Sequence, residues 1–473
     1  MNRFCHTRRC AAFFTLLVVC AGSQAWAEGL TLLTEQQLIE TLRSGAPAEK
    51  AIACKQLAIR GSKTAVPELA KLLADDQLSS WSRIALEAIP DPAADAALQE
   101  AAKSLHGQLL VGTINSIGVR KSSGAVDLLI EQLKDSDSEV ASASAVALGH
   151  IGNEKATAAL HDSLANKSAV RSAIAEGYIL CAEQLLAEGK NDRAAEIYDQ
   201  IRKADVPKQR VLEATRGAIV ARGVDGIPLL VEQLKSPDKK RFGLGLKTAR
   251  ELRGSEVAKA LSAQLAETSP DRASLLLVAL GDRSESGLPP EVLQAATSGN
   301  KQVRLAALQV VGRLGDASTV PALLAIAAGD DGELAEAAKA ALVALPGKDV
   351  NAELARRLPD AKGKTLNTLI ALVGQRRIDA VAELIKVFHS SNDATRSAAL
   401  LALGATAGSK DLPLLISEVT GAKNEDDAKQ AELALKTACI RMPEREGTAA
   451  MLAEAMSNAS PAARASIIRI LGA

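Results

Sequence analysis

Residues 301–315, KQVRLAALQVVGRLG, and residues 320–327, VPALLAIA, carry the clearest structural pattern in the sequence. In its first segment Val303, Ala306 and Val310 recur at the i, i+3 and i+7 spacing of one apolar helix face. The second segment carries a proline in its first turn, where a missing backbone N–H costs nothing. The two segments therefore predict a pair of helices, each with an apolar stripe that a neighbour must cover.

The same pair of segments recurs along the chain. VDLLIEQLK at 126–134 and IPLLVEQLK at 227–235 are identical at six of nine positions. The glycines that end the first segments, Gly152, Gly315 and Gly408, are predicted to cap their helices in the left-handed conformation. Three units fit between Gly315 and Gly408, so the repeat is about 31 residues long.

A single helix hairpin cannot bury its own apolar stripe, but a stack of hairpins can. The sequence therefore predicts an all-α fold, an α-solenoid of about 13 helix hairpins without significant β-structure. We expect one continuous right-handed superhelix with the proline-initiated second helices on its concave face.

The pattern V-R-x-A-A-L-x-x-L-G followed by Val-Pro-x-Leu-Leu resembles HEAT repeats of the short bacterial type, the PBS-lyase type. It is clearest at 300–328 and 392–420 and degraded at 28–110 and 425–473. The resemblance implies a HEAT-like α-solenoid over residues 28–473. It says little about function, because one fold hosts many functions.

Two stretches depart from the repeat pattern. Residues 167–205 are expected to be irregular, and the part at 182–201 resembles a tetratricopeptide hairpin with Gly189 at its turn. Residues 459–473 contain only the first helix of a last repeat. Such an end predicts a frayed helix, a partner that covers it, or a longer polypeptide.

Residues 1–27 are expected to form a signal peptide. Three arginines come before an apolar run at 11–22, and Ala25-Trp26-Ala27 fits the small-x-small pattern of signal peptidase sites. The run is too short to span a bilayer, although an uncleaved anchor is the alternative. We therefore expect cleavage between Ala27 and Glu28, export to the periplasm or the exterior by the Sec or the Tat route, and no membrane span afterwards.

Composition excludes several classes of protein. The chain has 56 basic and 56 acidic residues, so no charge excess favours nucleic acid, and we expect no nucleic-acid partner. Aromatic residues make up only 2%, too few for the stacking platforms of a single-strand groove. A hydrophobic content of 47% is too high for a disordered chain.

No motif predicts a catalytic residue, a cofactor or a metal. The sequence has no G-x-S-x-G, no phosphate-binding glycine loop and no C-x-x-C-H. His150 and His161 lie on successive predicted helices but lack further ligands nearby. Three cysteines beyond the signal segment lie in distant hairpins, which predicts buried free thiols at Cys54, Cys181 and Cys439.

Arginines recur near the start of the first helices, at Arg83, Arg171, Arg272, Arg304, Arg396 and Arg464. We predict that they pair with acidic residues of neighbouring turns, such as Asp137, Asp330 and Asp393, in a ladder along the stack.

These features favour a non-catalytic exported scaffold that docks protein partners or other ligands on the solenoid surface. The positions shared by the second helices predict the contact residues Glu131, Gln132, Glu232, Gln233, Glu383 and Lys386. The alternative is the HEAT-repeat arm of a larger exported enzyme, sugar hydrolase-like or haem-containing, with its catalytic domain outside this sequence. Partner identity, binding face and oligomeric state stay open.

Overall fold

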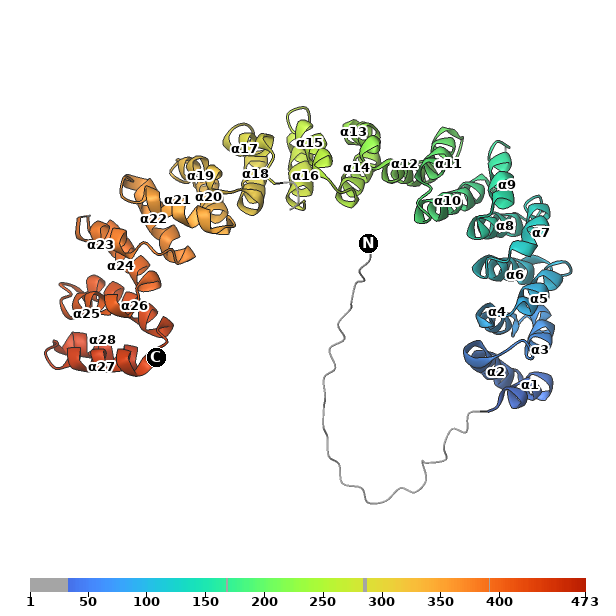
Figure 1. Ribbon diagram of the computed structural model, residues 1–473, viewed down its shortest axis with the longest axis horizontal. Coiled ribbons are helices and arrows are strands. Elements are labelled where there is room, and N and C mark those ends of the chain that lie inside the picture. Colours follow the sequence, from blue (N-terminus) through green and yellow to red (C-terminus); the bar gives the residue numbers. More distant parts are fainter. Residues whose placement is uncertain (1–32, 167–168, 284–286, 391) are drawn as a thin grey trace, which may run out of the picture. The chain divides into compact units, whose positions relative to one another are not determined.

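The computed structural model describes residues 33–166, 169–283, 287–390 and 392–473 (Figure 1). Every regular element in these residues is a helix. The predicted fold class, an all-α solenoid of helix hairpins, is confirmed. The predicted signal peptide lies outside the described residues, and none of the described helices is both long and apolar enough to cross a bilayer.

The chain forms two compact units, and the second begins at Thr157. The helices of the first unit are α1 (Glu35–Ser44), α2 (Pro47–Arg60), α3 (Val66–Lys71), α4 (Ser79–Ala88), α5 (Pro92–Ala102), α6 (Gly107–Val119), α7 (Val126–Gln132) and α8 (Ser138–Ile151). Helix α9 (Glu154–Leu164) contains the boundary.

The second unit continues with α10 (Arg171–Ala187), α11 (Asn191–Lys203), α12 (Lys208–Arg222), α13 (Ile227–Lys235), α14 (Lys239–Glu251), α15 (Ser255–Ala263), α16 (Pro270–Gly281), α17 (Pro290–Thr297), α18 (Lys301–Leu314) and α19 (Val320–Ala327). Then follow α20 (Gly332–Ala344), α21 (Lys348–Arg357), α22 (Gly363–Arg376), α23 (Val381–Ser390), α24 (Asp393–Thr406), α25 (Leu412–Thr420), α26 (Glu425–Arg441), α27 (Arg445–Met456) and α28 (Pro461–Leu471). Short 3-10 turns precede several second helices: η2 (Ser123–Ala125), η3 (Gly223–Gly226), η5 (Ala317–Thr319) and η6 (Ser409–Asp411).

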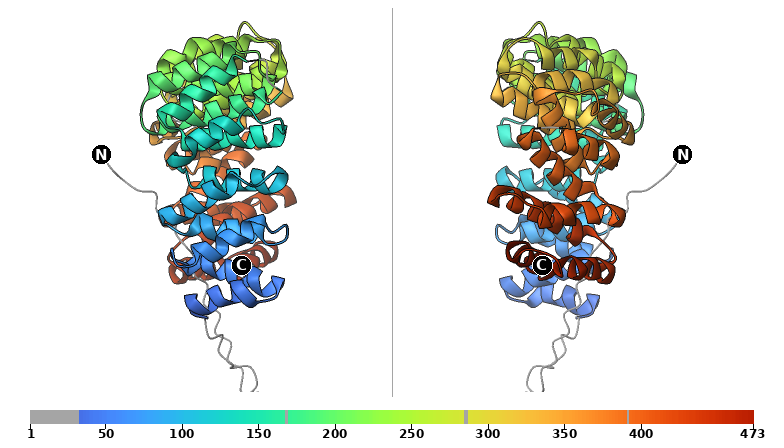
Figure 2. Two further views of the ribbon diagram at one scale, coloured as in Figure 1. Left: turned by 90° about the vertical axis from the view of Figure 1, so that its right-hand side faces the viewer. Right: turned by 90° about the vertical axis from the view of Figure 1, so that its left-hand side faces the viewer.

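Helices alternate between two layers in each unit. The even-numbered helices are the first helices of the repeats, and the odd-numbered helices are the second helices. Most first helices pack on the next first helix, as α2 does on α4 and α24 on α26, and on the second helix that precedes them, as α18 does on α17 and α24 on α23. Figure 2 shows the helices of each unit lying side by side in successive rows.

Local sequence sets the helix ends. The side chains of Asp137, Asp238, Asn300 and Asp331 accept hydrogen bonds from backbone N–H groups that start α8, α14, α18 and α20. These groups have no partner within their own helix, so the caps stabilise the start of each first helix. The second helices α13, α19 and α25 carry proline in their first turn, as the sequence predicts.

The left-handed cap predicted for the segment-final glycines is correct for Gly152, with φ of 63°. It is wrong for Gly315 and Gly408, whose φ values of −73° and −95° belong to extended backbone. At Gly315 the reason for glycine is space, because a Cβ atom would lie 2.5 Å from the carbonyl oxygen of Val311.

Glycines inside the first helices let neighbouring first helices approach closely. A Cβ atom on Gly312 would lie 2.9 Å from Cα of Ala341, and one on Gly404 would lie 2.7 Å from Cα of Ala434. The same glycine–alanine contact joins Gly118 to Ala147 and Gly374 to Ala402. Because Cβ atoms do not come this close to backbone, these positions set the spacing of the first-helix layer.

The second helices make fewer contacts with one another than the first helices do. Within the second unit taken alone, the first helices accordingly lie on the inner side of the bend and the second helices on the outer side (Figure 1). The expectation that proline-initiated second helices line a concave face is therefore wrong for this unit.

Buried arginines at the ends of first helices join successive repeats. Nη1 of Arg120 donates to the carbonyl oxygens of Leu86 at 2.7 Å and Ile89 at 2.6 Å. Its guanidinium also binds both carboxylate oxygens of Asp95, at 2.9 and 2.8 Å. Equivalent bonds run from Arg283 to the carbonyls of Ala249, Leu252 and Gly254, and from Arg376 to those of Leu342, Val343 and Leu345. Each arginine thus satisfies carbonyls that the preceding first helix leaves without an intrahelical partner.

The acidic ladder predicted for the arginines at helix starts is mostly wrong. Arg272, Arg304 and Arg464 donate to backbone carbonyls instead, because these lie within reach at the end of a preceding helix. Ion pairs form in two places, between Arg171 and Asp205 at 2.6 Å and between Arg396 and Asp393 at 3.1 Å. Of the other expected acids, Asp330 pairs with Lys364 and Asp137 caps α8.

The contact between α26 and α28 should be sensitive to acid. The Arg469 guanidinium, 2.6 Å from Glu432, lowers the pKa of that carboxyl to about 2, and the Ser466 hydroxyl also donates to it. A carboxyl whose pKa is lower in the folded state than its ordinary 4.5 stabilises the fold above pH 4.5 and loses that effect as pH falls toward 2. Thermal unfolding followed by circular dichroism should therefore show a larger fall in Tm between pH 5 and pH 3 for the native protein than for Arg469→Ala. Equal falls in Tm would contradict this.

Candidate functional site: an apolar face on the first helices

Large apolar side chains that reach solvent lie almost entirely on the first helices. Among the described residues they are Ile52, Ile59, Trp81, Ile84 and Val119 in the first unit, and Leu275, Val278, Val343, Leu433, Ile440, Ile468 and Leu471 in the second. The two exceptions, Leu33 and Val224, lie before α1 and in η3, so no such residue lies on a described second helix. Exposed apolar side chains that gather on one layer are typical of an interaction surface.

Four of these side chains gather on α2 and α4 of the first unit, and four others on α26 and α28 of the second. Ile52 and Ile59 lie two turns apart on one face of α2 and are 57% and 82% exposed. The neighbouring first helix α4 carries Trp81 and Ile84, three residues apart and 40% and 49% exposed. We call these four residues the α2–α4 patch. It combines aliphatic area with a tryptophan, the residue type most enriched at energetically dominant contacts.

The contact residues predicted on the second helices are not brought together. Glu131 and Gln132 lie on α7 in the first unit, whereas the other four lie on α13 and α23 of the second, which are not neighbours. Glu131, Glu232 and Lys386 are exposed and Glu383 is half-buried.

Gln233 does not have the exposure that the prediction requires, since its side chain is only 2% exposed. Its place three residues after Leu230 and one before Leu234 puts it on the buried stripe of α13. Gln132 is half-buried, and its side-chain oxygen is buried without a hydrogen-bond donor among the described residues. The shared sequence positions thus reflect packing as much as exposure.

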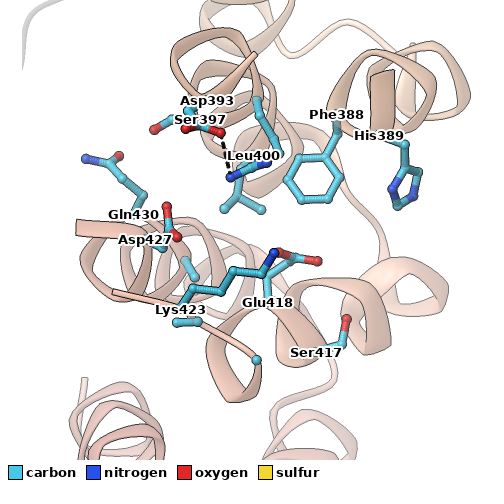
Figure 3. Close-up of a pocket in the computed structure, with 14 residues that line it drawn as sticks. Phe388, His389, Asp393, Ser397, Leu400, Ser417, Glu418, Lys423, Asp427 and Gln430 are labelled. Atoms are coloured by element: carbon cyan, nitrogen blue, oxygen red, sulfur yellow. Dashed lines mark ion pairs between the residues drawn. The ribbon is translucent and has the colours of Figure 1, made fainter. Parts of the chain in front are cut away.

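A pocket of about 330 Å³ is lined by residues of α23, α24, α25 and α26 (Figure 3). Its charged lining residues carry both signs: Asp393, Arg396, Glu418, Lys423 and Asp427. The Ser417 hydroxyl donates to the carbonyl of Leu414 in its own helix at 2.7 Å. Figure 3 shows His389 next to Phe388. The two rings meet edge-on, and their centroids are 5.2 Å apart. Among the described residues that line the pocket, no serine hydroxyl is bonded to His389, the pairing that nucleophilic catalysis uses.

Metal-ligating side chains do not cluster in the described parts of the chain, where no three His, Cys, Asp or Glu residues lie close enough to hold an ion. Nδ1 of His161 lies 3.1 Å from a carboxylate oxygen of Asp162, and its ring meets Tyr178 edge-on. These contacts explain the position of His161 by packing and hydrogen bonding.

The three described cysteines are free thiols, as the sequence predicts, and differ in burial. Burial raises the pKa of Cys54 and of Cys181 to about 11, and it also raises the pKa of the half-buried Cys439. At pH 8 a thiol of pKa 11 is about one part in a thousand thiolate, the reactive form. Ellman's reagent should therefore label Cys439 first and the other two only on unfolding, as peptide mass mapping can show. Prompt labelling of Cys54 in the folded protein would contradict this burial.

Comparison with known families supports the repeat architecture. Residues 95–178 match the family model for HEAT repeats. This HEAT-repeat segment extends from α5 into α10 and is well under half of the chain. No curated protein matches the chain.

Several solved helical structures are similar in fold alone. Kap121p bound to Pho4p shares 12% identity with a TM-score of 0.49, over 92% of this chain and 56% of that one. Yeast importin-beta (Kap95p) shares 13% identity with a TM-score of 0.42, over 92% and 69%. Human deoxyhypusine hydroxylase in complex with glycerol shares 18% identity with a TM-score of 0.26, over 60% and 96%. The chain thus spans a little over half the length of the Kap121p chain.

Proposed function

We propose that this protein is a non-catalytic exported scaffold that binds protein partners through the exposed face of its first helices. The observation that carries the proposal is that, among the described helices, the exposed large apolar side chains lie on the first helices and none on a second α-helix. The HEAT-repeat segment fits such a role, because stacked repeats present extended binding surfaces. Export rests on the sequence of residues 1–27.

A protein partner suits the chemistry of the α2–α4 patch. Complete burial of a fully exposed isoleucine contributes about 1.5–3 kcal/mol, so covering the exposed parts of Ile52, Ile59 and Ile84 supplies a substantial share of that for each, with few polar groups to desolvate. Trp81 adds a wide ring that loses little conformational entropy when it is buried. The second-helix residues Glu131, Gln132, Glu232, Glu383 and Lys386 remain proposed polar contact positions at three separate places in the chain.

The test compares two sets of substitutions in the full chain, produced with a C-terminal tag in its source cells. The first-helix variant carries Ile52→Gln, Ile59→Gln, Trp81→Gln and Ile84→Gln. The second-helix variant carries Glu131→Ala, Gln132→Ala, Glu232→Ala, Glu383→Ala and Lys386→Ala. Circular dichroism verifies that each variant folds, and quantitative mass spectrometry measures the proteins that co-purify with each.

We expect the recovered amount of a protein that co-purifies with the native chain to fall at least tenfold with the first-helix variant and to stay unchanged with the second-helix variant. The reason is that removing several anchor residues costs more than about 1.4 kcal/mol of binding free energy. Equal recovery with the first-helix variant would overturn the choice of surface. N-terminal sequencing of the same native protein tests export, and a start at Met1 instead of Glu28 would count against it.

A further inference from the structure

Acidic side chains on the first helices of the second unit are mostly neutralised by neighbouring helices. At the C-terminal ends, Arg216 pairs with Glu251 at 2.7 Å, and Asp282 lies 3.0 Å from Arg250. At the N-terminal end of α14, Asp238 pairs with Lys208 and caps its own helix. These carboxylates therefore add little free negative charge to the face between them.

Two lysines in the middle of that face have no such partner. Lys240 and Lys247 are exposed on α14, and neither ammonium group has a carboxylate within ion-pair distance among the described residues. They lie seven residues apart on one helix face, about 10 Å along the axis. The pair forms an uncompensated positive stripe two helical turns long.

Gly243 lies between the two lysines and leaves the backbone of α14 bare. It is exposed, and a Cβ atom there would meet nothing within 4 Å. Packing inside the protein does not require glycine at this position, although glycine is a poor helix former. A residue without a side chain on an exposed stripe allows the backbone of another helix to come close.

The next first helix, α16, carries exposed apolar side chains. Leu275 and Val278 on α16 are 48% and 45% exposed, and α16 packs against α14. On α14, Leu244 directly follows Gly243 and is half-buried. We define the α14–α16 groove as Lys240, Gly243, Leu244, Lys247, Leu275 and Val278.

We propose that the α14–α16 groove binds an acidic amphipathic helix of a partner protein. Two carboxylates two turns apart on that helix pair with Lys240 and Lys247, its backbone crosses α14 at Gly243, and its leucines cover Leu275 and Val278. Charge complementarity selects this occupant, since the two lysines without a carboxylate partner among the described residues outnumber the one exposed carboxylate on the same face of α16, Asp271, which accepts a hydrogen bond from the Gln302 amide. A lipid surface suits it less, because the groove has no exposed aromatic side chain.

The inference rests on the proposed scaffold function but names a separate surface and partner chemistry. Its probe is a fluorescein-labelled, lactam-bridged helical peptide of 18 residues with glutamates seven residues apart and leucines on the same face. Fluorescence anisotropy measures its Kd for the full chain at low and high salt. A peptide with lysine in place of both glutamates, and vesicles of anionic phospholipid, are tested in parallel.

Binding of the acidic peptide should weaken about tenfold in the Lys240→Glu, Lys247→Glu variant, since two pairs become two repulsions. Gly243→Leu should weaken it several-fold while the circular dichroism spectrum is retained. The matched control Lys134→Glu, Lys410→Glu makes the same charge change at exposed lysines on the second-helix side and should leave Kd within about twofold.

Three results would each overturn the inference. The native chain fails to bind the acidic peptide, the Lys240→Glu, Lys247→Glu variant binds the peptide equally well, or the chain binds vesicles through these lysines and does not bind the peptide. The α2–α4 patch is unchanged in these variants. Partner capture that persists at that patch while the peptide fails would therefore reject this inference and leave the proposed function standing.

Discussion

Replacing Arg120 with alanine should lower the free energy of unfolding of the first unit by about 3–5 kcal/mol, the usual cost of breaking a buried, hydrogen-bonded ion pair. The substitution removes the Arg120 donor from the carbonyl of Leu86, removes one of two donors from that of Ile89, and leaves Asp95 without its cation. Arg120→Lys should recover little of the loss, because an ammonium group cannot reproduce the planar, multiply bonded guanidinium. Urea unfolding followed by circular dichroism measures the change.

The matched control is Arg313→Ala. The Arg313 side chain is 59% exposed and lies 3.6 Å from its partner, Asp282. Its loss should change the free energy of unfolding by no more than about 0.5 kcal/mol. If the two substitutions had equal effects, the buried arginines would not be what joins successive repeats.

A single methyl group should have opposite effects at two glycines of the second unit. Gly404→Ala should destabilise by about 1–3 kcal/mol, because its Cβ would lie 2.5 Å from the carbonyl oxygen of Ala434 and α24 and α26 would have to separate. Gly243→Ala should stabilise by about 0.5–1 kcal/mol, because alanine favours the helix and nothing lies within 4 Å of the new methyl group.

Thermal and urea unfolding of the two variants side by side measure both changes. A stabilising effect of Gly404→Ala would mean that glycine does not set the distance between first helices. A destabilising effect of Gly243→Ala would mean that the exposed stripe of α14 is more closely covered than the structure shows.

The sequence was sufficient to predict the repeat and its fold class. The i, i+3 and i+7 spacing at Val303, Ala306 and Val310 and the proline at the start of α19 depend on local geometry, which a short segment determines by itself. Contacts between repeats were harder to predict. The bonds of Arg120 to carbonyls about 31–34 residues earlier depend on how one hairpin lies on the next.

The predicted contact surface was placed on the second helices because the Glu-Gln-Leu positions recur there. That pattern could not separate Glu232, which is exposed, from Gln233, which packs into the core. A signal for the first-helix face was present, since Leu275 to Val278 form an unbroken apolar run of four. One buried stripe cannot accommodate such a run, so part of it had to face solvent.

The apolar first-helix face is the central claim, and site-specific photocrosslinking in the source cells tests it most directly. A benzophenone side chain is placed singly at Ile52, Ile84, Leu275 or Ile440 on the first helices, and at Glu131, Glu232 or Lys386 on the second helices. Protein adducts of discrete mass are expected at the first-helix positions. Adducts confined to the second-helix positions, with none on the first helices, would contradict it.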